Sequence, residues 1–191
     1  RVMIVLRLPL GIIIAAVGVY MWGFVFWAGG VVNNGLHFTD QMSEDVVLGT
    51  LSQSLPESGT YILPAQPRDD QLAWLERQMQ GPLATIHYVD HGVDSMAPSV
   101  LAKGFVHMLV SVALMALILK AVVVALPSYP LRFAFVLAMG VVASLFANLG
   151  KPIWFHYDWA FHFWRAVYDL GAYAVAGVAL AYFVRPPGSP G

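Results

Sequence analysis

The sequence predicts a mainly α-helical integral membrane protein, a bundle of four transmembrane helices with a small αβαβ cap between helices 1 and 2. Hydrophobic residues make up 59% of the 191 residues and charged residues 11%, with a mean hydropathy of +0.68. Soluble domains contain about 25% charged residues. Two long apolar runs, 104–126 and 131–149, are joined by the short turn 127–130. Each run is long enough to cross about 30 Å of hydrocarbon as a helix, which a water-soluble domain does not need.

The predicted organisation follows the apolar segments. Helix 1 is expected within 1–28, the cap over 29–98, helices 2–4 within 99–185, and a disordered tail over 186–191. Within these limits the four crossings are 8–27, 99–126, 131–149 and 167–184. The first run is too long for the apolar region of a signal peptide and has no convincing cleavage site after it, so we expect it to be retained.

The distribution of charge predicts the orientation. One side of the bundle holds both termini and the turn 127–130; it has no acidic residue, and its basic residues are Arg1, Arg7, Lys120, Arg132 and Arg185. The other side holds all eleven acidic residues and the other five basic ones. Positively charged flanks stay in the cytoplasm. We therefore expect a multi-pass protein of a bacterial inner membrane with both termini cytoplasmic and residues 29–103 in the periplasm.

The exported segment has a pattern of its own. Asp40 is expected to cap a helix that ends near Ser54, and Asp69 or Asp70 a second helix that ends near Gln80. Short β-rich runs follow each helix, at 60–63 and at 83–89. Two strands do not form an independently stable sheet, so the cap must rest on the bundle or on a partner.

Two groups of residues predict contacts with lipid or with other membrane proteins. The segment 150–166 is expected to be an aromatic outer loop, running as a short helix along the membrane surface, because Trp and Tyr favour the headgroup level. Its tryptophans are Trp154, Trp159 and Trp164. Small residues in the fourth crossing allow helices to approach closely in lipid; they are Ala172, Ala176, Gly177 and Ala181.

Histidine is the residue type here that suits catalysis, metal binding or haem binding. Four side chains are expected near the outer face: His107, His156, Asp158 and His162. Imidazoles and a carboxylate bind zinc, copper or iron, and a pair of histidines holds a haem. The alternative for His107 is a hydrogen bond to a neighbouring helix, and for the others interface anchoring, with Asp158 near Lys151 or Arg165.

Two further groups of ionisable residues have both a functional and a simpler interpretation. His87, Asp90 and His91 end the second cap strand; they suit a surface metal site or, more simply, a solvated strand end. Asp169 is the acid expected to be most buried. It suits a proton relay, or more simply an ion pair with Arg165 one turn earlier.

The sequence excludes several classes of function. The absence of cysteine excludes disulfides, thiol catalysis and iron–sulfur clusters. There is no Gly-rich phosphate loop and no GxSxG motif, and no basic patch interleaved with aromatic residues points to nucleic acid. We expect a non-catalytic accessory subunit or assembly factor that binds larger membrane proteins or itself. The alternatives are a redox protein with a haem or transition metal at His107, His156 and His162, or a lipid- or quinone-binding protein.

Turn residues of the cap carry one resemblance. The pattern Glu57-Ser-Gly59-x-Tyr61-x-x-Pro64, then Gly81-Pro82 and Met96-x-Pro98, resembles a loose family of uncharacterised small bacterial four-span inner-membrane proteins. The resemblance covers about residues 45–185, implies the same topology and implies no activity.

Overall fold

The computed structural model describes residues 2–66 and 69–187, which form two units. The first, here the helical unit, contains the residues up to 37 and those from 96 onward. The second contains residues 38–95 and is named the external unit after the location that the charge distribution predicts for it. Each unit is described by itself.

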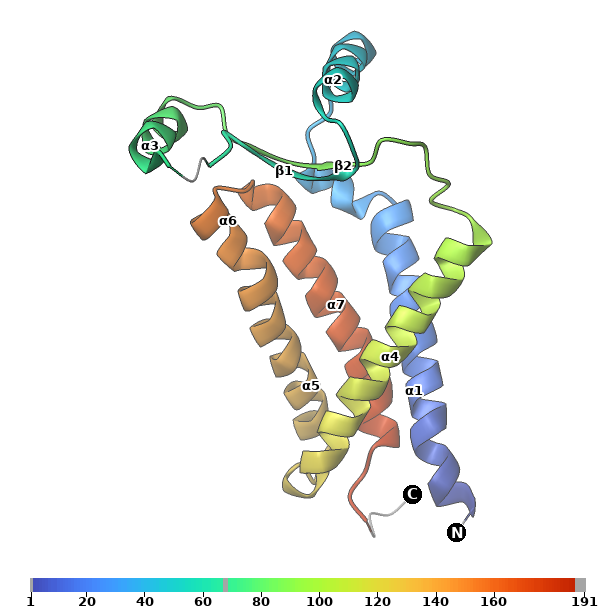
Figure 1. The fold of residues 1–191 in the computed structure, drawn as a ribbon. Coiled ribbons are helices and arrows are strands. Elements are labelled where there is room, and N and C mark those ends of the chain that lie inside the picture. The colour runs from blue at the N-terminus through green and yellow to red at the C-terminus, as the bar shows by residue number, and fades with distance from the viewer. Residues whose placement is uncertain (1, 67–68, 188–191) are drawn as a thin grey trace. The chain divides into compact units, whose positions relative to one another are not determined.

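The helical unit consists of four long helical stretches (Figure 1). They are α1 (Val2–Gly23) continued by the π-helical turn η1 (Phe24–Ala28), α4 (Pro98–Val122) continued by the 3₁₀ turn η3 (Val123–Ala125), α5 (Tyr129–Ser144) continued through the π-helical turn η4 (Leu145–Leu149) into α6 (Gly150–Phe155), and α7 (Trp159–Phe183). A 3₁₀ turn, η2 (Val31–Gly35), follows η1. Four segments are long and apolar enough to span a membrane: Arg7–Ala28, Pro98–Ala125, Tyr129–Phe155 and Trp159–Phe183. The predicted number of candidate spans is therefore confirmed.

Helix α7 lies between α1 and α5, and α4 packs mainly against α1 (Figure 1). The core contains small side chains where the helices approach most closely. Its fully or nearly fully buried members include Ala15, Ala16, Val19, Val112, Ala116, Leu119, Val136, Ala176 and Leu180. Gly140 of α5 meets α7 at Tyr173, where a Cβ added to the glycine would lie 2.6 Å from the tyrosine Cβ. Small residues thus allow the close helix contacts that hold a bundle together in lipid.

The same packing corrects one part of the predicted partner surface. Ala172, Ala176, Gly177 and Ala181 are buried inside the helical unit. Gly177, for example, faces Phe133 of α5, whose Cδ2 would lie 3.2 Å from an added Cβ. Because α7 has a neighbour on both sides, its small residues serve the protein's own bundle and are not available to another protein.

The segment 150–166, expected as an outer loop that runs as a short helix, is divided between two helices. Residues 150–155 continue the third helical stretch as α6, and α7 already begins at Trp159, so only 156–158 are non-helical. Asp158 explains the early start of α7, because its carboxylate accepts a hydrogen bond from the backbone N–H of Phe161 at 2.7 Å. Of the three tryptophans, Trp154 and Trp159 are exposed and Trp164 is partly buried.

The external unit has the predicted order of elements: α2 (Gln41–Ser54), β1 (Gly59–Leu63), α3 (Gln71–Gln80) and β2 (Ala84–Tyr88). Asp40 and Asp70 cap the two helices, each accepting a hydrogen bond from a backbone N–H three residues later at 3.0 Å. The two strands pair antiparallel, with Gly59 opposite Tyr88 and Leu63 opposite Ala84. Helix α3 therefore lies in the connection between β1 and β2, which leads from Leu63 to its partner Ala84.

We expect Gly140→Ala to destabilise the helical unit. The added methyl group would overlap Tyr173, and overpacking of this kind costs about 1–3 kcal/mol. Thermal unfolding in detergent, followed by circular dichroism, measures the loss. Gly49→Ala on α2 is the matched control, because nothing lies within 4 Å of its added Cβ and alanine favours a helix over glycine. Equal melting temperatures for Gly140→Ala and the unmodified protein would contradict the packing described here.

Candidate functional site

The four residues predicted to bind a metal lie on different elements. His107 is exposed on α4, His156 is exposed in the turn between α6 and α7, and His162 is buried on α7 at 5% exposure. His156 ends α6 in the left-handed conformation, with φ at 56°. Asp158 is occupied as the cap of α7. In the described part of the chain no three His, Asp or Glu side chains are grouped closely enough to hold a metal ion.

The haem and transition-metal alternative therefore gains no support from the arrangement of these residues. His107 belongs to α4, which packs mainly against α1, whereas His162 lies on α7. The His162 ring stacks on Tyr157, with 5.5 Å between ring centroids and 19° between planes. Its Nδ1 is buried and has no hydrogen-bond partner among the residues that the structure describes.

A polar cluster that the sequence did not predict joins α5 to α7. Oδ2 of Asp169 accepts a hydrogen bond from Nδ2 of Asn148 at 2.6 Å and another from Oγ of Ser144 at 3.3 Å. Ser144 and Asn148 are both buried and lie one helical turn apart. Both donors converge on one carboxylate oxygen, so the cluster locks two helices together rather than presenting several oxygen ligands to a cation.

The expected ion pair of Asp169 with Arg165 is wrong. The guanidinium of Arg165 lies instead over the rings of Trp27 and Phe161, at 5.7 and 5.9 Å from their centroids. Such cation–π contacts keep an arginine paired without a carboxylate. The signal that could have identified the true partners is the spacing of Ser144 and Asn148, two polar residues four apart in an otherwise apolar run.

A second unpredicted polar site is centred on Arg132, which is 5% exposed at the start of α5. Its Nε donates to the carbonyl oxygen of Ala181 at 2.9 Å, and one terminal nitrogen donates to the carbonyls of Leu126 and Pro127 at 3.1 and 2.8 Å. These carbonyls stand near the ends of helices, where backbone acceptors lack partners within the helix. The guanidinium thus ties the end of α7 to the turn between η3 and α5.

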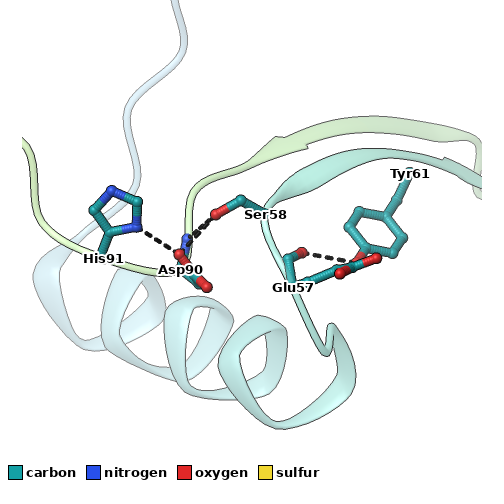
Figure 2. A network of polar contacts seen from close by, with 5 residues as sticks. All are labelled: Glu57, Ser58, Tyr61, Asp90 and His91. Atoms are coloured by element: carbon teal, nitrogen blue, oxygen red, sulfur yellow. Dashed lines mark hydrogen bonds and ion pairs between the residues drawn. The ribbon is translucent and has the colours of Figure 1, made fainter.

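The external unit holds a network of exposed polar residues at the open end of its hairpin (Figure 2). The Ser58 hydroxyl donates to Oδ1 of Asp90 at 2.6 Å, and Nδ1 of His91 lies 2.6 Å from the same oxygen. The backbone N–H of Asp90 donates to Ser58 Oγ at 3.0 Å. The Tyr61 hydroxyl donates to the carbonyl of Glu57 at 2.8 Å, as Figure 2 also shows.

The order of groups in this network argues against nucleophilic catalysis. A nucleophilic serine needs a base, usually an imidazole, that accepts its proton. Here the Ser58 hydroxyl donates to Oδ1 of Asp90, and Nδ1 of His91 contacts the same oxygen rather than Ser58 (Figure 2). The Ser58 hydroxyl, and secondly His91, hold the pKa of Asp90 below its ordinary value of 3.8. The network therefore holds the residues before β1 against those after β2 through the carboxylate of Asp90. We call this group of Ser58, Asp90 and His91 the clasp.

We expect Asn148→Leu to destabilise the helical unit by about 1–3 kcal/mol, because it leaves a partly buried carboxylate oxygen without its closest donor. Thermal or denaturant unfolding in micelles measures the effect. The double variant Asn148→Leu/Asp169→Leu should recover most of the loss, since removing both partners can be nearly neutral. Simple additivity of the two single losses would contradict a direct contact.

We expect the hairpin to loosen in acid. A carboxyl whose folded pKa is lowered stabilises the fold above its unfolded pKa, and that stabilisation is lost as the pH falls through the folded value. Hydrogen exchange at β1 and β2 should therefore accelerate below about pH 4 beyond its intrinsic pH dependence. Ser58→Ala, which removes the main cause of the lowered pKa, should reduce this effect. An unchanged pH dependence in Ser58→Ala would contradict the clasp. The readout must be local, because Ser43 also lowers the pKa of Asp40 at α2.

No protein-family model matches the sequence, no curated protein matches it, and no solved structure matches the fold.

Proposed function

We propose that this chain is a non-catalytic accessory protein of the bacterial inner membrane, and that its external unit docks on the basic, periplasmic part of a larger membrane protein. The observation that carries the proposal is the composition of the external unit. It is strongly acidic, it has apolar helix faces in contact with solvent, and it has almost no core of its own.

Apolar side chains of both helices in the external unit are exposed. On α2 they are Met42, Val46, Val47 and Leu48, and on α3 they are Leu72, Leu75 and Met79. Among the described residues of this unit only Pro64 is buried. A two-stranded sheet is marginally stable at best in water, and exposed apolar patches mark interaction sites. The unit therefore gains stability when another surface covers these faces.

Charge favours one class of partner. Residues 38–95 contain nine of the eleven acidic residues and two of the ten basic ones, which gives the unit a net charge of −7 with histidine neutral. This charge repels the surface of an anionic bilayer and also a second copy of the same unit. A protein surface with Lys and Arg around an apolar centre is complementary to it.

The position of the basic residues supports the orientation. The beginning of α1, the end of α7 and the turn between α4 and α5 lie at one end of the helical unit (Figure 1). The basic residues near that end are Arg7, Lys120, Arg132 and Arg185, and the acidic residues lie elsewhere. Positively charged flanks remain in the cytoplasm, so the external unit belongs on the opposite, periplasmic side.

Substitutions on α3 test the docking. Leu72→Asp/Met79→Asp places two charges on the exposed apolar face, where Leu72 is 75% and Met79 is 82% exposed. We expect the membrane protein that copurifies with the tagged wild-type chain in mild detergent to fall at least about tenfold, a loss of about 1.4 kcal/mol. Quantitative mass spectrometry measures the recovery. Retention should also decline as salt rises, because complementary charges are screened.

Gln80→Asp is the control, because it adds a charge to α3 on a different side of the helix. This variant should retain the partner. A wild-type chain that purifies as a stable monomer without a partner would contradict the proposal. So would equal retention by all variants, or loss of the partner only when the helical unit is altered.

A further inference from the structure

Two polar side chains lie on the exposed face of α4, one helical turn apart. Lys103 and His107 are both exposed, and residues four apart on a helix have neighbouring side chains. The opposite face of α4 packs against α1, where Val112, Ala116 and Leu119 are buried. The two polar side chains therefore point away from the bundle.

The beginning of α4 is held firmly. The hydroxyl of Tyr20 on α1 donates to the carbonyl of Leu101 at 2.9 Å, and the rings of Tyr20 and Phe105 meet edge to face at 5.5 Å. Lys103 and His107 thus project from a fixed segment. The Ser111 hydroxyl, one turn further, donates to the carbonyl of His107 at 2.9 Å, so it is already satisfied by the helix.

The positive charge of Lys103 has no counterion in the described part of the chain. Neither Lys103 nor the His107 side chain has a hydrogen-bond or ion-pair partner there, and α4 contains no acidic residue. A charged or ionisable group on the lipid-facing side of a membrane helix is costly unless it is paired. An anion is therefore the missing partner.

Below these two residues the same face of α4 is apolar. Its exposed side chains are Val106, Val110, Leu114, Leu117 and Ile118, each 46–57% exposed. Two cationic or hydrogen-bonding groups thus stand at one end of an apolar track. The order of polarity along the helix is that of a phospholipid, with a phosphate at one end and acyl chains below it.

Depth distinguishes a lipid phosphate from a carboxylate on another membrane helix. Lys103 lies five residues after Pro98, the first residue of α4, which is about 7.5 Å along the axis. In the proposed placement α4 begins at the membrane surface, so the long stem of Lys103 can extend to the level of the lipid phosphates. Carboxylates within membrane helices are rare.

We propose that Lys103 and His107 bind the phosphodiester of one anionic phospholipid, of the phosphatidylglycerol class, whose acyl chains lie along the exposed face of α4. An anionic lipid is favoured over phosphatidylcholine because it brings no quaternary ammonium group near Lys103. The site requires the membrane placement given above and is independent of the docking of the external unit.

Native mass spectrometry of the full chain in detergent tests the site with phosphatidylglycerol and phosphatidylcholine of identical acyl chains. The wild-type protein should retain one phosphatidylglycerol, and Lys103→Gln/His107→Gln should bind it at least about tenfold more weakly. Lys151→Gln, which removes a half-buried base at α6, is the control and should bind as the wild type does. Unfolding in lipid-free detergent should be the same for all three proteins.

Unchanged binding in the double variant would overturn the proposal, and so would an equal loss in Lys151→Gln or equal affinity for phosphatidylcholine. Loss of a copurifying protein without loss of lipid would assign the residues to a protein contact and would also overturn it. Leu72→Asp/Met79→Asp should keep the lipid, so failure of the docking proposal and failure of the lipid site can be told apart.

Discussion

The close packing of α7 between α1 and α5 is the constraint on which the helical unit depends. In hydrocarbon, apolar side chains gain nothing by leaving one apolar surface for another, so helices associate through packing and hydrogen bonds. Gly140 and Gly177 allow Tyr173 and Phe133 to come within contact distance of the facing backbone. Trp22 fits beside Gly171 in the same way and donates its indole N–H to the carbonyl of Tyr168 at 2.9 Å.

Close packing also decides where the polar groups of the helices stand. Water is absent from such interfaces, so each polar side chain must find its partner within the protein. Asp169 finds Asn148 and Ser144 across the α5–α7 contact. Arg132 finds backbone carbonyls near helix ends, and these carry the partial negative charge of the helix dipole. The contacts of Asp169 and of Arg132 both connect α7 to the helical stretch that contains α5, so both stabilise the arrangement of these helices.

Much of the fold could be read from the sequence because its signals are local. Apolar runs located the four candidate spans, and Asp40 and Asp70 marked the starts of α2 and α3. The end of the third helical stretch and the start of the fourth were misplaced within 150–166 because Trp, Tyr and His have low hydropathy. A partly buried helix nevertheless tolerates these residues. Asp158 is a typical N-cap residue and could have marked the start of α7, but the aromatic composition of the segment favoured a loop in the prediction.

The partners of the polar residues could not be read in the same way, because they depend on tertiary contacts. Arg165 and Asp169 are four apart on one helix, which predicts an ion pair on an exposed surface. Their side chains instead turn to opposite neighbours, Arg165 toward Trp27 and Asp169 toward α5. The four proposed metal ligands are not grouped in the described part of the chain for a related reason: His107 lies on another helix, Asp158 caps α7 and His162 is buried on α7.

The two units differ in how their polar and apolar side chains are arranged. The helical unit pairs Asp169 and Arg132 internally and turns apolar side chains outward. The external unit turns apolar side chains outward as well, with Leu72 and Met79 more than two-thirds exposed, but it lies in a segment too acidic to enter lipid. Water penalises such a surface and an anionic membrane repels it. A partner that is both apolar and basic would relieve both costs at once, which is the physical basis of the docking proposed for the external unit.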